Sequence, residues 1–296
     1  MKLLVTRSIF VVTSQYLTQF RMILKKKLPT LFAFALAVLV VSACQRKKFE
    51  NLKAAEDMAL AESLFSDAFK QVAGAGQATA DSLKAYNELL AGCGTLSITP
   101  FDTTTWPKIV TLDFGNSNCV GDDGRTRRGK IIGSFTHWFR SAGTVVTINF
   151  DDYFVNDHEI LGTKTITNNG PNTANHLVYS ISFLDCQIVK PNNGGTIHWS
   201  TTRQHEWMEG ENTFTPYDDV WNVRGSATGS SSDGTDFSLN IVQDLNVKYG
   251  CRWIRSGILD MDIEGLNTIN VNYGTGACDA NAVLTYEGTD YPFVMQ

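Results

Sequence analysis

The sequence predicts a mainly β protein: an antiparallel meander, built as a curved sheet or a two-layer sandwich, with a short helical segment before it. Three observations predict this fold class. From Pro100 onward, short alternating stretches are rich in Val, Ile, Thr and aromatic residues, as in half-buried strands. Turn dipeptides that end in glycine separate these stretches. Apolar residues make up 43% of the 296 residues, which is enough for a sizeable core.

The first 43 residues differ from the rest of the chain. They contain six basic side chains and no Asp or Glu. Lys25, Lys26 and Lys27 precede an apolar run from Leu31 to Val41, which is shorter than the ~20 residues that cross a bilayer. A basic region, an apolar run and small residues, in that order, are typical of a secretory signal peptide. We therefore expect residues 1–43 to be a signal peptide, with Met22 as an alternative start because 43 residues is long for one.

The apolar run ends in Val41-Ser42-Ala43-Cys44. This segment resembles the lipobox of bacterial lipoproteins, which has a branched apolar residue, a small residue, Ala or Gly, and then the cysteine that receives diacylglycerol. The resemblance implies that Cys44 is lipidated and that the mature chain is held on a membrane. The alternative is a buried helix that ends in an incidental cysteine.

Charge and the residues after Cys44 bear on partners and location. Removal of residues 1–43 leaves 19 basic and 30 acidic residues, a formal charge of −11. This balance disfavours nucleic acid, which requires a basic face. Gln45 to Lys48 contains no acidic residue. We therefore expect an outer-membrane anchor that faces the periplasm, with exposure at the cell surface as the alternative.

Residues 44–98 are expected to form a lipidated tether and a helical segment. From Glu50 to Val72, apolar residues recur every three or four positions with acidic residues between them, which predicts an amphipathic helix. Gly74 and Gly76 should end it, and a second short helix should follow over Asp81 to Leu90. We expect the apolar stripe to pack on the main domain; a helix pair that assembles with a partner is the alternative.

Residues 99–296 are expected to form the antiparallel β domain. Its hairpin turns should lie at Asp123-Gly124, Asn169-Gly170, Asn193-Gly194 and Asp233-Gly234. The predicted strands are Ile109–Phe114, Lys130–Phe139, Thr144–Val155, Glu159–Thr167, Leu177–Val189, Gly195–Trp207, Asp219–Thr228, Phe237–Val247, Arg252–Ile263, Thr268–Tyr273 and Ala282–Val294.

The cysteine spacing repeats. Cys93 lies 26 positions before Cys119, and Cys251 lies 27 before Cys278. Leu112-Asp113-Phe114-Gly115 precedes Cys119 as Val271-Asn272-Tyr273-Gly274 precedes Cys278. In an oxidising compartment this predicts the disulfides Cys93–Cys119 and Cys251–Cys278, with Cys186 left as a buried thiol. A chance coincidence of spacings and a swapped pairing of Cys119 with Cys278 are the alternatives.

No catalytic motif is present, so we predict no catalytic residue, metal ligand or cofactor. His205-Glu206-Trp207-Met208-Glu209 lacks the second histidine of a zinc-peptidase helix. His198 and His205 should lie on opposite faces of one strand. The doublets Asp122-Asp123, Asp151-Asp152 and Asp218-Asp219 are not glycosidase pairs, because adjacent strand residues point to opposite faces.

One strand offers a candidate ligand face. Trp199, Arg203, His205 and Trp207 share one parity along the predicted strand. Indole rings beside polar groups on a rigid sheet suit stacking on sugars. The alternative is a core face that the N-terminal helix covers.

The overall organisation, over most of the mature chain, resembles that of uncharacterised lipoproteins of the Bacteroidota, most closely from Gly250-Cys251-Arg252-Trp253-Ile254 through Tyr273-Gly274 to Cys278. This resemblance implies no activity and no site residues. We expect a lipid-anchored envelope protein that acts as a binding or structural module, presents a sheet face to a glycan or an envelope protein, and is not an enzyme. A carbohydrate-active hydrolase with acids on separate strands is the alternative.

Overall fold

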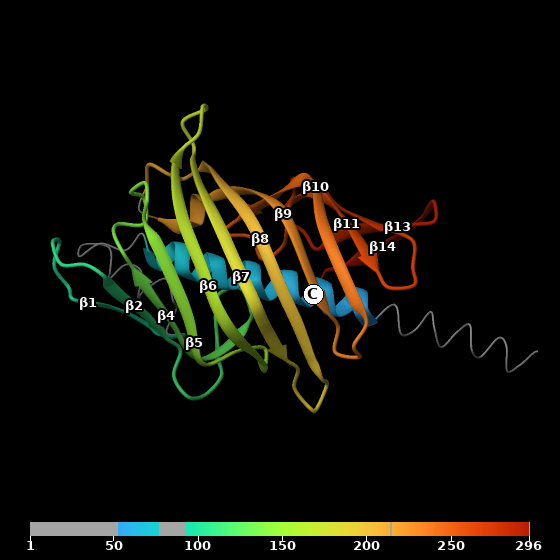
Figure 1. Cartoon of the computed structure of the whole chain (residues 1–296), viewed down its shortest axis with the longest axis horizontal. Helices are drawn as coiled ribbons and strands as arrows, with labels where there is room; N and C mark the ends of the chain where they lie inside the picture. The colour runs from blue at the N-terminus through green and yellow to red at the C-terminus, as the bar shows by residue number, and fades with distance from the viewer. Residues whose placement is uncertain (1–52, 77–92, 214, 296) are drawn as a thin grey trace, which may run out of the picture. The chain divides into compact units, whose positions relative to one another are not determined.

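The computed structural model describes residues 53–76, 93–213 and 215–295, and it is mainly β, as predicted. One helix, residues 53–76, packs against one antiparallel sheet of 14 strands (Figure 1). The strands are β1 (Thr95–Thr99), β2 (Lys108–Asp113), β3 (Cys119–Val120), β4 (Thr126–Phe135), β5 (Val145–Val155), β6 (His158–Pro171), β7 (Leu177–Val189), β8 (Thr196–Glu209), β9 (Val220–Ser230), β10 (Asp236–Lys248), β11 (Ser256–Ile263), β12 (Ile269–Thr275), β13 (Asn281–Tyr286) and β14 (Thr289–Val294), with a short 3-10 helix, η1 (Pro216–Asp218), before β9.

The sheet is a meander. Each strand pairs with the next along the chain, except that β2 pairs with β4 and β3 pairs only with β4. The outer two strands on this path, β1 and β14, each have a single neighbour. Of the two architectures predicted, the single curved sheet is therefore the one found. The helix crosses one face of this sheet behind β6, β7 and β8 (Figure 1).

Bulges recur along neighbouring strands of the sheet. Register shifts interrupt the pairing of β4 with β5, of β6 with β7 and of β10 with β11. Gly129, Gly162 and Gly257 lie at these shifts with φ values of 80°, 115° and 114°. A bulge bends its strand and increases the local twist. These bulges therefore let one continuous sheet curve around the helix.

Helix 53–76 is buried on almost every side. Its apolar residues join the main core, and Asp57, Asp67 and Lys70 are buried as well. The prediction that the helix packs on the β domain is confirmed. The helix extends past Val72 and Gly74 to Gly76, the second of the two glycines predicted to end it. A Cβ at position 76 would lie 2.8 Å from the Phe135 ring and 3.1 Å from that of Phe139, so this glycine allows close approach to the sheet. The second predicted helix, 81–90, lies outside the described residues.

Ionic contacts attach the helix to the sheet along its length. Asp57 pairs with Lys190 and accepts a 2.8 Å hydrogen bond from the Ser232 amide. Glu62 binds Arg203 at 2.7 Å. Asp67 binds two guanidinium groups, and its contacts to Arg125 and Arg127 are 3.0 and 2.6 Å long. The helix is therefore held in one register as well as buried.

Several predictions about strands and turns were wrong in detail. β1 and β3 were not predicted, β1 begins within the segment 44–98 that was expected to be tether and helix, and β11 begins at Ser256 rather than at Arg252. The stretch predicted as one strand, Ala282–Val294, is the hairpin β13–β14, because Glu287 and Gly288 turn the chain with φ values of 50° and 76°. Asn169-Gly170 is not a hairpin turn; it lies inside β6, where Gly170 forms a bulge, and the chain turns at residues 172–175 instead. The strand predicted at Lys130–Phe139 is β4, which begins at Thr126 and ends at Phe135.

Both predicted disulfides are present. Cys93 bonds to Cys119 with a Cα–Cα distance of 5.1 Å, and Cys251 bonds to Cys278 with 5.8 Å. Each bond closes the open end of a hairpin, β1–β2 or β11–β12. Cys186 is a buried free thiol, as expected.

The repeated motif before the second cysteine of each pair has the same local structure. The Gly115 amide donates to the Asp113 carboxylate at 2.9 Å, and the Gly274 amide donates to the Asn272 side chain at 2.9 Å. Both glycines have positive φ, 76° and 88°. The repeated sequence motif therefore forms the same local turn before the second cysteine of each disulfide.

Candidate functional site

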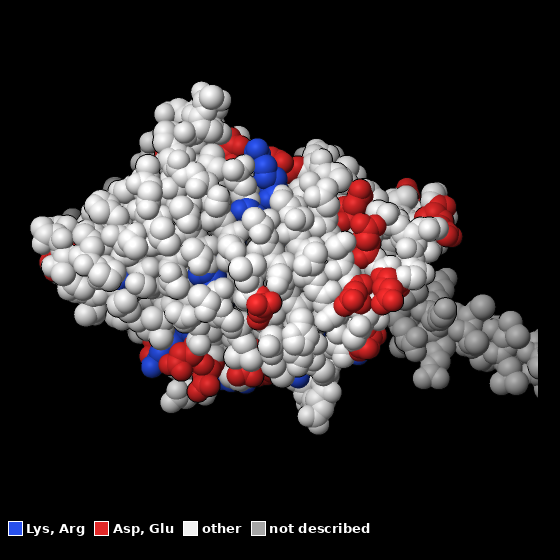
Figure 2. Space-filling model, viewed as in Figure 1, with Lys and Arg blue, Asp and Glu red and all other residues white. Residues whose placement is uncertain are grey.

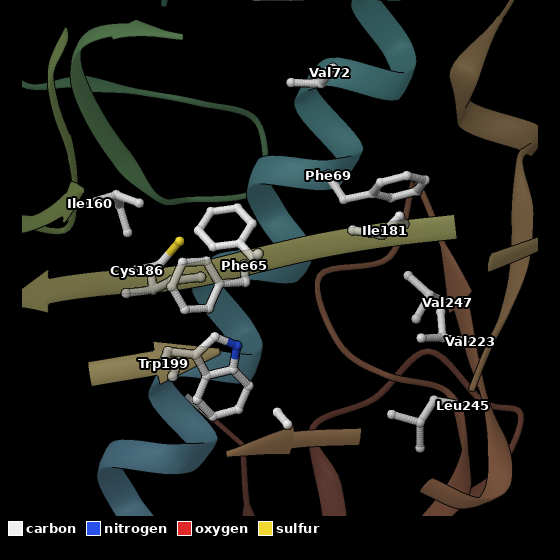
Figure 3. Close-up of a cluster of buried hydrophobic side chains, with 14 of the residues drawn as sticks. Phe65, Phe69, Val72, Ile160, Ile181, Cys186, Trp199, Val223, Leu245 and Val247 are labelled. Atoms are coloured by element: carbon white, nitrogen blue, oxygen red, sulfur yellow. The ribbon is translucent and has the colours of Figure 1, made fainter. Parts of the chain in front are cut away.

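The predicted ligand face is a core face. Trp199, Arg203, His205 and Trp207 do lie on one side of β8, but helix 53–76 covers them and their exposed fractions are 2%, 6%, 7% and 0%. The ring of Phe65 stacks on Trp199 with centroids 5.8 Å apart, as Figure 3 shows. This corrects the expectation of exposed indoles: burial of two large aromatic rings favours packing beneath the helix over display to solvent.

The remaining members of this face are also engaged. The Phe69 ring meets the His205 ring edge-on at 4.2 Å, and Trp207 stacks on Trp221 at 4.5 Å. The Trp207 indole donates to the Asp219 carboxylate at 3.2 Å. A sugar could therefore reach none of these rings without displacement of the helix.

A polar groove lies on the opposite face of the sheet, over β7 to β10. Its volume is about 460 Å³, within the usual range for small-molecule sites. His198 lies here, away from His205, which confirms that the two histidines occupy opposite faces. The side chains that line it are Asp185, Gln187, His198, Ser200, Thr228, Ser230 and Asp236. Gly229 also borders it, as do Trp199 and Phe237, whose side chains are buried in the core.

Strand register aligns these side chains in two rows. Gln187, His198, Ser230 and Asp236 are direct cross-strand neighbours on four successive strands. Ser200 and Thr228 form the next row, and the Asp185 amide donates to the Ser200 hydroxyl at 3.1 Å. Neighbouring strands lie ~4.8 Å apart, so the first row extends about 14 Å across the sheet.

A bulge in β7 places Asp185 in the groove. The register shifts between Phe183 and Cys186, and both Leu184 and Asp185 are exposed although they are adjacent in the chain. Asp185 has a φ of 52°, a conformation that Asp adopts more readily than most residues. The other polar side chains of the groove belong to every second residue of their strands. The bulge adds the Asp185 carboxylate to the groove and leaves the Leu184 side chain exposed beside it.

The groove offers carboxylate, amide, imidazole and hydroxyl groups and no Lys or Arg. Figure 2 shows this face of the molecule, on which few charged side chains lie over the middle of β6 to β8. Such a set suits a ligand rich in hydroxyl or amino groups and repels an anionic one. No cluster of three or more His, Cys, Asp or Glu side chains in the described part of the chain is arranged to hold a metal ion.

The two acids of the groove come from strands that are not adjacent. Asp185 and Asp236 lie on β7 and β10, three strand spacings apart, which is about 14 Å between backbones before their offset along the strands. The two carboxyl groups of an inverting glycosidase lie ~6.5–9.5 Å apart. The backbones of Asp185 and Asp236 are farther apart than that.

The aspartate doublets have structural roles. Asp123 binds Arg127 at 2.6 Å, Asp152 has a φ of 47° at the bulge opposite Gly129, and Asp219 accepts the Trp207 hydrogen bond. Asp123 is thus a turn residue, Asp152 a bulge residue and Asp219 a core residue.

Comparisons with known protein families, with curated proteins and with solved structures found no match. Among the described residues, no helix is both long and apolar enough to cross a bilayer.

Proposed function

We propose that this chain is a lipid-anchored protein of the bacterial cell envelope that binds a neutral or amino-bearing glycan in the groove over β7 to β10. The observation that carries the proposal is the groove itself, in which seven polar side chains from four strands line about 460 Å³ without a Lys or Arg. Hydroxyl-rich rings present donors and acceptors along their edges, and the two rows of side chains can meet both.

The disulfides support the compartment in this proposal. Persistent disulfides are rare in the cytosol and common in exported proteins. Two are present, each at the open end of a hairpin. An export signal in residues 1–43 and lipidation of Cys44 would deliver the chain to such a compartment.

An envelope protein is the alternative partner. Standard protein interfaces bury ~800 Å² on each side around apolar or aromatic anchors. The lining of the groove is mostly polar, and Leu184, which precedes Asp185 in the chain, is an apolar side chain that is 62% exposed. This composition favours a small polyhydroxyl ligand.

A glycan panel tests the binding proposal. The purified protein is screened against neutral, amino-bearing and uronic-acid oligosaccharides, with both retention and product release measured. We expect micromolar to millimolar binding of neutral or amino sugars without turnover. His198→Ala and Asp236→Asn should each weaken binding about tenfold or more, because each removes a direct contact worth ~1.4 kcal/mol. Thr202→Ala, on the same face of β8 but outside the groove, is the matched control and should bind normally.

Two outcomes contradict the binding proposal. Preference for uronic acids would contradict the groove chemistry. Product release that is lost in Asp185→Asn or Asp236→Asn would replace binding with hydrolysis.

Labelling with palmitate tests the anchor. We expect Cys44→Ala to abolish label and to leave unprocessed precursor, because the thiol is the site of acylation. One acyl chain gives only marginal membrane binding, so two or three chains are expected on the mature N-terminus. Label that persists in Cys44→Ala would refute the anchor without affecting the glycan result.

A further inference from the structure

A small cavity lies between helix 53–76 and the covered face of the sheet. Its volume is about 40 Å³, and Phe65, Phe69 and Trp199 are among the residues that line it. Figure 3 shows part of this wall, with Phe65 and Phe69 on the helix and Ile181, Val223 and Leu245 on the strands. A cavity of this size holds on the order of one to three water-sized particles.

Polar groups without hydrogen-bond partners line this cavity. Trp199 Nε1 and Arg203 Nη1 are buried donors that make no hydrogen bond, and His205 Nδ1, which donates or accepts according to the tautomer of the ring, is buried and unpaired as well. Lys164 lies beside them, 3% exposed, with its ammonium 5.1 Å from the Phe69 ring centre and 5.5 Å from that of Phe183. Indole, guanidinium and ammonium groups can only donate. Each of these residues is more than nine-tenths buried.

The carboxylate in the same wall and one of its two hydroxyl groups are already engaged, and the Ser66 hydroxyl is the further side-chain oxygen that lines the cavity. The Glu62 carboxylate binds Arg203 at 2.7 Å, and the Thr201 hydroxyl donates to the Ser226 carbonyl at 2.8 Å. Buried donors that lack an acceptor cost ~1–3 kcal/mol each. The cavity is therefore rich in donors and poor in acceptors.

The charged side chains around the middle of the helix are also unbalanced, with more cations than carboxylates. Five cationic side chains lie there, Lys70, Arg125, Arg127, Lys164 and Arg203, against three carboxylates, Glu62, Asp67 and Asp123. The excess is two positive charges. Arg125, Arg127 and Arg203 have carboxylate partners, and Lys70 donates to the Cys251 carbonyl at 2.6 Å. Among the described residues, Lys164 has neither kind of partner.

We propose that this cavity binds one small monatomic anion, such as chloride, held by the Lys164 ammonium and the unpaired N–H groups of Trp199 and Arg203. A monatomic anion accepts hydrogen bonds and donates none, so it can pair with the unpaired donors that face the cavity. Its negative charge also compensates the charge of the Lys164 ammonium. Water alone would leave the ammonium uncompensated in a low-dielectric layer, which is costly.

Proton binding at Lys164 is linked to anion binding. Burial lowers the pKa of Lys164 to about 7, against the opposing influence of Cys186, Glu62 and Asp67. Burial, Lys164 and Arg203 keep the pKa of His205 well below its ordinary value, and burial raises the pKa of the Cys186 thiol to about 12. His205 and Cys186 are thus neutral near pH 7. Only the protonated lysine attracts an anion, so affinity should fall about tenfold per pH unit above pH 7.

Bromide is the direct probe. Crystals of the protein grown at pH 6 in sodium bromide should show an anomalous peak in the cavity beside Lys164. A cavity that contains only water at pH 6 overturns the proposal, and so does bromide found at surface sites alone. This readout needs no substitution and therefore does not depend on whether a variant folds.

Thermal unfolding supplies the second measurement. At pH 6 and equal ionic strength, chloride should raise the Tm saturably relative to gluconate, and the effect should shrink at pH 8. Lys164→Met should lose the dependence on chloride, whereas Lys130→Met, a half-exposed lysine on β4, should retain it. Equal chloride dependence in both variants contradicts the assignment.

Discussion

At the scale of single residues, Asp67 has the most constrained surroundings. It is 2% exposed on helix 53–76 and binds Arg125 and Arg127 of the sheet. Burial alone would raise the pKa of Asp67, but Arg127 and Arg125 hold it well below its ordinary range. Because the folded pKa is the lower one, its contribution to stability is present above about pH 4 and is lost as the pH falls below that.

We expect Asp67→Asn to lower the free energy of unfolding by about 3–5 kcal/mol at pH 7, because it removes a buried carboxylate and leaves the guanidinium groups of Arg125 and Arg127 to share the more exposed Asp123. Asp157→Asn is the matched control: the same substitution removes an exposed partner of Arg128, for which a much smaller loss is expected because solvent screens the pair. Urea unfolding measures both. Similar losses in the two variants would show that burial does not set the energy of the Asp67 pairs.

Gly162 shows how one bulge depends on a missing side chain. Its φ is 115°, and a Cβ there would lie 2.5 Å from the Cys186 sulfur. Gly162→Ala should destabilise by about 2–5 kcal/mol, of which ~1–2 comes from the backbone and ~1–3 from overpacking.

The double variant with Cys186→Ala should recover only part of this loss, because the contact with the sulfur disappears but the strain in φ remains. Gly265→Ala, with a φ of 80° and open space around it, isolates the backbone cost. Denaturant unfolding of all four proteins checks this, and full recovery in the double variant would assign the whole loss to the sulfur contact.

At the scale of elements, the two disulfide-closed hairpins are the clearest units. Each closes a loop of about 25 residues, for which chain entropy predicts ~3 kcal/mol. We expect Cys93→Ala/Cys119→Ala and Cys251→Ala/Cys278→Ala each to lower the free energy of unfolding by about that amount. Non-reducing peptide mapping of the wild type should recover only these two pairings. A measured loss below ~1 kcal/mol would mean that the hairpin is closed in the unfolded state by other contacts.

These hairpins were predictable because the sequence repeats their closure. Asp113 and Asn272 each accept a hydrogen bond from a following glycine, a local interaction that needs no knowledge of the rest of the fold. The end of β13 was not predictable in this way. Glu287-Gly288 is not among the strongest turn dipeptides, and it adopts its turn because Ala282 and Phe293 pair across the strands.

The candidate groove was missed for a related reason. Alternation along β7 predicts which residues face the core, but a bulge changes that parity after Phe183. Leu184 and Asp185 are adjacent and both face solvent, but they indicate a surface site only when the bulge is already known. The row from Gln187 to Asp236 depends on the register of four strands, which a single sequence does not fix.

At the scale of the whole molecule, helix and sheet form one core. The amphipathic pattern predicted the apolar stripe correctly but not the burial of Asp57, Asp67 and Lys70, whose partners are far away in the sequence. Charges in a helix indicate a solvated face unless a sheet supplies partners. The predicted ligand face at Trp199 and Trp207 has the same explanation. Residues of one parity along a strand can face either solvent or the core, and only the position of the helix decides which.

Removal of the helix therefore tests how the molecule is built. Residues 93–296 retain every strand and both disulfides but lack Met58, Leu64, Phe65, Phe69 and Val72, all buried. Burial of five such side chains contributes on the order of 10 kcal/mol, as an upper estimate, which equals the whole net stability of a typical domain. The same deletion leaves Arg125, Arg127 and Arg203 facing an apolar surface without Asp67 and Glu62.

We expect residues 93–296 to be aggregated or to bind a hydrophobic dye without a cooperative transition, while residues 51–296, one compact unit, unfold cooperatively. Cooperative unfolding of 93–296 near the midpoint of the longer chain would instead make the sheet an independent domain and the helix a detachable cover, and the rings of Trp199 and Trp207 would then be available to a ligand after all.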